Sequence, residues 1–140
     1  MSEETLVRGI LLTHGSMAQG MADAVRRISG IGPEALVAMS NDGKSPETLK
    51  MELDELLAGG PVVIFTDLAS GSCALAARVC CRRGSDQVVV FGANLPMLLD
   101  FVFHRHLPLQ ELVPRLLVRG RESLQSVPEF PHDADPPVQG

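Results

Sequence analysis

The sequence predicts an α/β fold, a three-layer doubly wound domain built on a parallel four-stranded sheet of order 2134. Short apolar segments alternate with longer amphipathic or apolar segments of helical length, and this alternation is typical of a parallel sheet wrapped by helices. Right-handed crossovers between four strands most economically give the order 2134. The first and third strands are then neighbours.

Two strand–helix pairs are expected in the first half of the chain. The first strand spans 7–13 and is nearly continuous in Ile and Leu, as expected of a strand covered on both faces. Its helix spans 17–28, where apolar residues recur at helical spacing. The second strand spans 36–39, and the turn signal Asn-Asp-Gly at 41–43 follows it. The second helix spans 45–57 and opens with Ser-Pro-Glu. The serine can cap a helix, the proline is tolerated in the first turn, and the glutamate is favoured at the positive end of the helix dipole.

The second half of the chain is expected to supply two more strands and three helices. The third strand spans 61–66, and the fourth spans 88–91. The helix between them, over 73–83, is apolar almost all round and is therefore expected to be largely buried. A helix over 96–103 and a last amphipathic helix over 109–124 follow.

Length and charge indicate one cytoplasmic domain. We expect a domain over 1–126 and a Pro-rich flexible tail or linker over 127–140. Lys and Arg total 12 against 17 Asp and Glu, and this net charge of -5 argues against a nucleic-acid or anionic-membrane surface. No segment approaches the roughly 18 apolar residues of a membrane span, and the acidic start is unlike a signal peptide.

The cysteines are interpreted as small hydrophobic side chains of the core. Cys73, Cys80 and Cys81 form neither an even disulfide framework nor a CxxC pair. Their spacing places them on one face of a helix, which favours burial. This usage fits a reducing compartment.

A histidine and a carboxylate follow the two strands expected to be neighbours. In doubly wound sheets the ligand crevice lies beyond the carboxyl ends of such strands, where the direction of winding reverses. His14 follows the first strand and Asp67 follows the third, so we expect the two side chains to meet. A carboxylate bonded to one imidazole nitrogen fixes the tautomer and leaves the lone pair of the other nitrogen outward. His14 is then a nucleophile or a base.

Small residues beside this pair are the candidate phosphate-binding groups. Gly71 and Ser72 open a helix, whose first backbone N–H groups are aimed at the crevice and can hold a phosphoryl group without a metal. Gly15, directly after His14, is the third candidate. With Asp67 these residues favour phosphohistidine chemistry that needs neither a metal nor a cofactor.

Three other interpretations are weaker. A Ser72, His14, Asp67 triad for acyl transfer lacks the tight nucleophile elbow and has its histidine first in chain order. Gly43-Lys44-Ser45 imitates the end of a phosphate-binding P-loop, but the first glycine of that motif would fall on an alanine. The pair His104 and His106 has no evident third metal ligand and more simply complements a helix dipole.

The chain resembles the IIA component of the mannose family of the phosphoenolpyruvate-dependent sugar phosphotransferase system (PTS). The resemblance covers about 7–126 and rests on four features in order: Thr13-His14-Gly15 at a strand end, Asp67 followed by a Gly-Ser-containing turn, Gly92-Ala93-Asn94-Leu95-Pro96-Met97-Leu98, and Gly120-Arg121-Glu122. The family's turn usually reads Gly-Gly-Ser/Thr-Pro, whereas this chain has Ser70-Gly71-Ser72-Cys73.

The resemblance implies a phosphocarrier. His14 would accept a phosphoryl group from the phosphohistidine of the carrier protein HPr and pass it to a IIB component, with Asp67 orienting the ring. Ser72 matches the family's hydroxyl position and would donate a hydrogen bond to the phosphoryl oxygens. The resemblance also implies a homodimer that exchanges an additional strand, for which 124–127 is the candidate, and membrane contact only through transporter subunits.

Two related roles use the same histidine and stay open. The chain would be the phosphotransfer subunit of a dihydroxyacetone kinase, or a regulatory module that signals through its phosphorylation state. The segment Asn94-Leu95-Pro96-Met97 favours the sugar-system relative over the kinase subunit.

Overall fold

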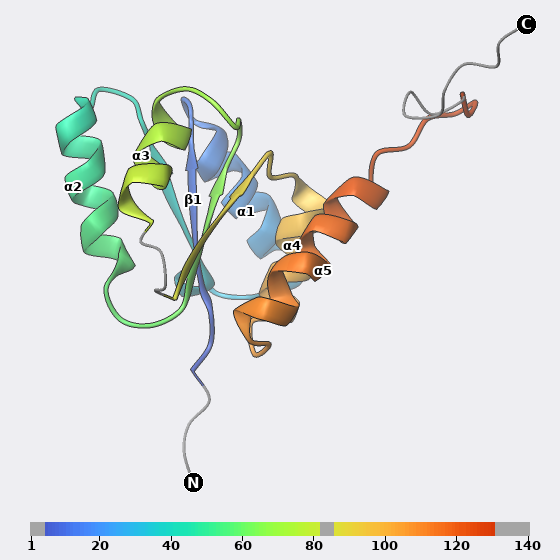
Figure 1. Cartoon of the computed structure of the whole chain (residues 1–140). Helices are drawn as coiled ribbons and strands as arrows, with labels where there is room; N and C mark the ends of the chain where they lie inside the picture. Colours follow the sequence, from blue (N-terminus) through green and yellow to red (C-terminus); the bar gives the residue numbers. More distant parts are fainter. Residues whose placement is uncertain (1–4, 82–85, 131–140) are drawn as a thin grey trace, which may run out of the picture.

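A parallel four-stranded sheet of order β2-β1-β3-β4 forms the middle layer of the computed structural model, which describes residues 5–81 and 86–130 (Figure 1). This is the predicted order. The strands are β1 (Arg8–Thr13), β2 (Leu36–Ser40), β3 (Val62–Thr66) and β4 (Gln87–Phe91). β1 pairs with both β2 and β3, so the loops after these three strands share one edge of the sheet.

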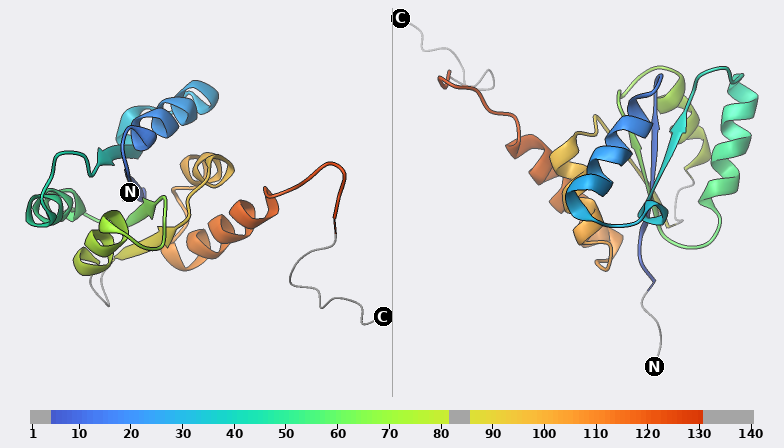
Figure 2. Two further views of the ribbon diagram at one scale, coloured as in Figure 1. Left: turned by 90° about the horizontal axis from the view of Figure 1, so that it is seen from above. Right: turned by 180° about the vertical axis from the view of Figure 1, so that it is seen from behind.

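Helices cover both faces of the sheet. They are α1 (Met17–Ser29), α2 (Pro46–Leu57), α3 (Ser72–Cys80), α4 (Leu95–Phe103) and α5 (Leu109–Glu122), with a short 3-10 helix at Pro33–Ala35. α2 and α3 lie on one face, and α1, α4 and α5 lie on the other (Figure 2). The predicted α/β class and layers are confirmed. None of the helices in the described ranges has the length and apolar character needed to cross a bilayer.

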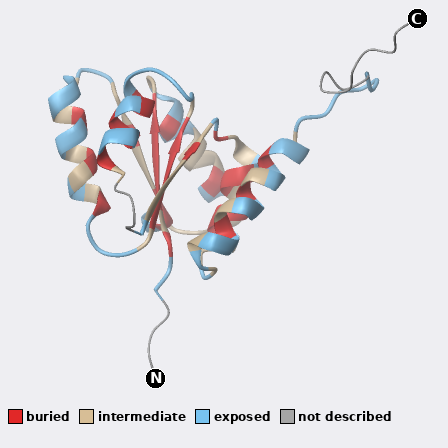
Figure 3. Ribbon diagram, viewed as in Figure 1, coloured by how far each residue is buried: buried red, intermediate tan, exposed pale blue. Residues whose placement is uncertain are grey.

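The side chains of the central strands alternate between two apolar clusters. Ile10, Leu12 and Ile64 face α2 and α3, whereas Leu11 and Phe65 face α1, α4 and α5. All five residues are at most 1% exposed (Figure 3). This burial on both faces explains why the strands read as continuous apolar segments.

Local signals set the helix ends. Ser45 accepts a hydrogen bond from the backbone N–H of Thr48 and caps α2, as its sequence predicts. Asn94 caps α4 in the same way, by accepting from the N–H of Met97. The predicted element bounds agree with the structure to within one to three residues, although the expected end of α3 at 83 lies outside the described residues.

The prediction that α3 is largely buried is wrong for its outer side. Cys73 and Cys80 are buried as expected, but Leu75 and Val79 are 61% and 53% exposed. α3 packs with one side on the sheet and on α2, and among the described residues no other element covers its outer side. Cys81 follows the helix and is only partly buried.

Residues 123–130 leave the body of the domain after α5 (Figure 1). They contain neither a helix nor a strand in this single chain, and they expose Leu124, Val127 and Phe130. The candidate exchanged strand over 124–127 concerns a dimer and stays a prediction. Most of the expected tail, 131–140, lies outside the described residues.

Two glycines give a matched test of the packing. Gly9 in β1 lies under the buried ring of Phe101, and a Cβ there would come within 2.7 Å of that ring and 2.9 Å of Leu36. We expect Gly9→Ala to lower the free energy of unfolding by about 1–3 kcal/mol, because the overpacked core must shift. A Cβ at Gly20 in α1 would meet nothing within 4 Å, so Gly20→Ala should raise the free energy of unfolding by about 0.5–1 kcal/mol. Urea unfolding measures both, and a Gly9→Ala protein as stable as wild type would contradict the packing.

Candidate functional site

The structure brings His14 and Asp67 together at the carboxyl edge of the sheet. His14 directly follows β1, and Asp67 directly follows β3. Leu12 pairs with Thr66 in the parallel register of the two strands, so the residues just beyond them lie side by side. The loops after β1 and β3 therefore meet, as their places in the sequence predict.

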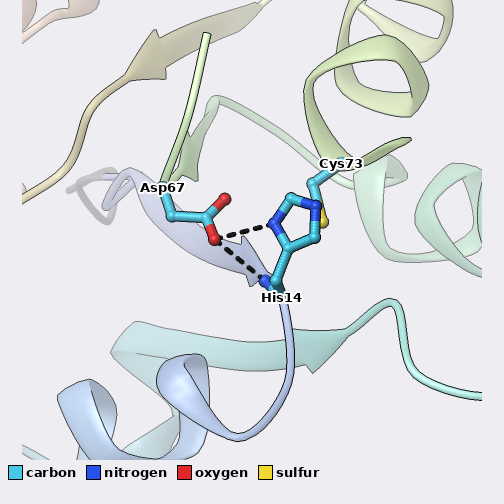
Figure 4. A group of neighbouring side chains, drawn as sticks. All are labelled: His14, Asp67 and Cys73. Carbon is cyan, nitrogen blue, oxygen red and sulfur yellow. Dashed lines mark hydrogen bonds and ion pairs between the residues drawn. The ribbon is translucent and has the colours of Figure 1, made fainter. Parts of the chain in front are cut away.

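The Asp67 carboxylate is fixed by three N–H groups. Its Oδ2 lies 2.9 Å from Nδ1 of the His14 ring and accepts a hydrogen bond of 3.0 Å from the His14 backbone N–H (Figure 4). Its Oδ1 accepts from the backbone N–H of Leu68 at 3.0 Å. The side chain of Asp67 is 9% exposed, against 41% for His14. The carboxylate is thus held behind the ring, and the ring faces outward.

These contacts decide the ionisation of Asp67 and the tautomer of His14. Burial alone would raise the pKa of Asp67, but the hydrogen bonds from the backbone and ring of His14 outweigh it and hold the pKa below the usual 3.8. An ionised carboxylate can only accept, so Nδ1 must carry the proton. In the neutral ring, Nε2 then holds the lone pair.

Of the predicted phosphate-binding residues, Gly71 lies directly beside Nε2. Gly71 adopts φ +95°, which L side chains rarely adopt, and a Cβ built there would lie 3.5 Å from Nε2. Ser72 follows as the first residue of α3, whose leading N–H groups have no acceptor within the helix. Gly15 directly follows His14, in the turn between β1 and α1.

Asn41 also lies at this edge of the sheet, although its sequence pattern predicts only a turn. Its Oδ1 lies 3.4 Å from the backbone N of Gly15, and its Nδ2 donates to the Ser72 hydroxyl at 3.0 Å. Asn41 directly follows β2, which is the third strand to end at this edge. That position is the signal that could have identified it.

Cys73 completes a group of possible metal ligands with His14 and Asp67, whose donor atoms all lie within 4.8 Å of one another (Figure 4). Burial, and to a smaller extent the charge of Asp67, raise the pKa of the Cys73 thiol to about 11, whereas a hydrogen bond with Ser72 acts to lower it. A metal would need the thiolate. It would also compete with the contact between Nδ1 and Oδ2. The donor set therefore suits a hydrogen-bonded imidazole better than a metal, and the expectation of no metal stays a prediction.

The other candidate motifs have local structural roles. Nδ1 of His104 lies 2.8 Å from the backbone oxygen of Asp100 at the end of α4. Lys44 forms an ion pair of 2.8 Å with Glu52 of α2. Within residues 5–81 and 86–130, neither His104 nor His106 belongs to a group of three possible metal ligands.

Comparisons with known proteins match this chain to a protein family and to solved structures. The profile of the EIIA-man family, described as the PTS system fructose IIA component, matches residues 9–115. The matched range contains His14, Asp67 and Ser72. A search of curated proteins found no similar sequence.

Solved structures share the fold. A phosphotransferase system component EIIA from Streptococcus agalactiae is 20% identical with a TM-score of 0.82, over 88% of this chain and 98% of that one. A mannose/sorbose specific IIA subunit from Enterococcus faecalis is 23% identical with a TM-score of 0.77, over 91% and 98%. A putative phosphoenolpyruvate-dependent sugar PTS permease from Klebsiella pneumoniae is 22% identical with a TM-score of 0.77, over 91% and 96%.

The lowered pKa of Asp67 predicts a pH-dependent contribution to stability. A carboxyl group whose pKa is lowered in the folded protein stabilises the fold at pH values above its ordinary pKa of 3.8. This stabilisation is lost as the pH falls through the lowered pKa. Asp67→Asn should therefore cost about 1–2 kcal/mol at neutral pH, and the difference from wild type should shrink in acid. Urea unfolding at several pH values measures this. Glu55→Gln, an exposed change on α2, is the control, and a deficit that persists undiminished below the lowered pKa of Asp67 would contradict the assignment.

Proposed function

Because the chain belongs to the EIIA-man family of PTS components, we propose that it is a phosphocarrier that accepts a phosphoryl group on His14 from phospho-HPr and passes it to a IIB component. The observation that carries this proposal is the contact of 2.9 Å between Nδ1 of His14 and Asp67, which leaves Nε2 as the acceptor. The role places the chain in the cytoplasm, where it reaches the membrane only through transporter subunits.

The transfer is a displacement at phosphorus between two imidazole rings. The lone pair on Nε2 of His14 attacks in line and forms a new N–P bond while the N–P bond of the donor histidine breaks. The electron pair of the broken bond returns to the donor ring. His14 keeps its Nδ1 proton, so its ring becomes cationic when it carries the phosphoryl group. No free proton is released, and the reverse sequence delivers the group to IIB.

The charges of the site suit this step. Asp67 lies against the Nδ1 side, where it stabilises the ring cation, and does not face the incoming anionic phosphoryl group. Gly71 lies beside Nε2, and Ser72 follows it at the start of α3 with free N–H groups and a hydroxyl, while Gly15 directly follows His14. Phosphoryl transfer depends mainly on positioning and electrostatics, so a prepared edge of this kind is sufficient.

The surroundings of His14 suit a protein donor. The His14 side chain is 41% exposed at the sheet edge. Met17 at the start of α1, Leu68 after Asp67 and Leu75 on α3 are 45%, 55% and 61% exposed. Exposed apolar residues near a reactive group are typical of a surface that another protein covers.

We also propose that two chains form a homodimer by exchanging residues 124–127 as an added strand. The segment after α5 extends away from the body of the domain (Figure 3). Its apolar side chains Leu124, Val127 and Phe130 are exposed, and none of the described residues covers them. The sheet has two end strands, β2 and β4, and an end strand can accept a strand from another chain.

Labelling with radioactive phosphoenolpyruvate, enzyme I and HPr tests the phosphocarrier. Wild type should acquire an acid-labile label, and His14→Ala should acquire none. Asp67→Ala should be labelled roughly 100-fold more slowly, because it loses the group that orients the ring and stabilises its charge.

Stable labelling of His14→Ala would refute the assignment. An acid-stable label would point to Ser72 as the acceptor. Offering the labelled protein to IIB or to nucleotide-loaded dihydroxyacetone kinase subunits then separates the two phosphocarrier roles, and transfer to neither would favour the regulatory module.

The dimer is tested by light scattering of protein separated by size. Wild type should have the mass of two chains, and Leu124→Asp should have the mass of one, because a carboxylate would have to be buried in the interface. Gln125→Asp in the same exposed segment is the control, since adjacent residues of a strand face opposite sides. A monomeric wild type would contradict the proposal.

A further inference from the structure

Asn41 is held at the site by its own backbone. Its N–H donates to the backbone oxygen of Thr13, the last residue of β1, at 3.2 Å. Its carbonyl oxygen accepts from the N–H of Lys44 at 3.3 Å and closes the turn after β2. These two hydrogen bonds fix the backbone of Asn41 beside the turn that follows β1. The side-chain amide therefore has a defined place between the loops after β1 and β3.

The amide can face its neighbours in only one way. The backbone N–H of Gly15 can only donate, so the atom of Asn41 that lies 3.4 Å from it must be the oxygen. The amide nitrogen then faces Ser72 and donates to its hydroxyl oxygen at 3.0 Å. A flipped amide would set two donors against each other at Gly15. Gly15 therefore determines which group of Asn41 meets Ser72.

This orientation determines what the Ser72 hydroxyl can do. A hydroxyl has one proton and two lone pairs, and here one lone pair receives the Asn41 N–H. Its proton is not needed for that bond, and the sulfur of the neighbouring Cys73 thiol is only a weak acceptor for it. Ser72 follows Gly71, whose Cβ position lies 3.5 Å from Nε2 of His14. An anionic phosphoryl oxygen on Nε2 would be a strong acceptor for this proton.

We propose that Asn41 is a positioning residue that makes the Ser72 hydroxyl a donor to the phosphoryl group on His14. The inference rests on the proposed phosphocarrier function and adds to it the residue that prepares the phosphate-binding side. Asn41 acts through Ser72. Its amide is also uncharged, so it adds no repulsion to the incoming phosphoryl group.

Two substitutions separate this role from simple support of the turn. Asn41→Ala removes the amide. Asn41→Asp keeps the size and an oxygen for Gly15, but its carboxylate can only accept, so Ser72 would turn its proton away from the phosphoryl group. Asp42→Asn is the matched control, because Asp42 is exposed in the same turn. Urea unfolding of each variant verifies that it is folded.

The experiment uses phosphoramidate, a small-molecule phosphoryl donor, and follows the phosphohistidine signal of His14 by phosphorus NMR. Asn41→Ala, Asn41→Asp and Ser72→Ala should each be phosphorylated roughly 10-fold to 100-fold more slowly than wild type, as expected for one lost hydrogen bond to a charged group. Asp42→Asn should show no decrease. Because no protein donor is needed, the result is independent of whether HPr labels the chain.

The double variant decides between the two roles. If Asn41 acts through Ser72, adding Asn41→Ala to Ser72→Ala should change the rate by no more than about twofold, because the group it positions is already absent. A residue that merely supports the turn would lower the rate equally in both backgrounds, and that result would overturn the proposal. Phosphorylation of Ser72→Ala or Asn41→Asp at the wild-type rate would also overturn it.

Discussion

The hydrogen bond between the His14 ring and the Asp67 carboxylate depends on the register of two parallel strands. The residues are 53 positions apart, and they meet because β1 and β3 end together with Leu12 opposite Thr66. A slip of one residue would turn every side chain of a strand to the other face. Ile10, Leu11 and Phe65 are buried in two different clusters, so the core resists such a slip. Core packing therefore sets the geometry of the site.

The sheet edge keeps negative and donor groups on opposite sides of the imidazole. The carboxylate of Asp67 lies against Nδ1, while Gly71 and the start of α3 lie by Nε2. Asn41 brings in the loop after β2 and binds both Gly15 and Ser72. In the proposed function the three loops have separate roles: the first carries the nucleophile, the second orients and stabilises it, and the third prepares the donors. This proposed division fits the transfer of an anionic group by a chain whose net charge is -5.

The sequence predicts the strand order and the meeting of His14 with Asp67 because both follow from apolar periodicity and topology. It does not predict the role of Asn41, since a polar residue in a turn has no pattern that shows where its amide points. The exposure of Leu75 and Val79 was also unpredictable, because hydrophobicity all round a helix does not show whether another element covers it. Side-chain direction and surface cover arise only from the packed fold.

The contact with Asp67 fixes the tautomer of His14 with the proton on Nδ1. Long-range proton–nitrogen NMR of the imidazole, recorded where the ring is neutral, tests this most directly. We expect a protonated, pyrrole-type signal for Nδ1 of His14 and a pyridine-type signal for Nε2, with the preference weakened in Asp67→Ala. A ring that carries its proton on Nε2 in the wild-type protein would contradict this tautomer.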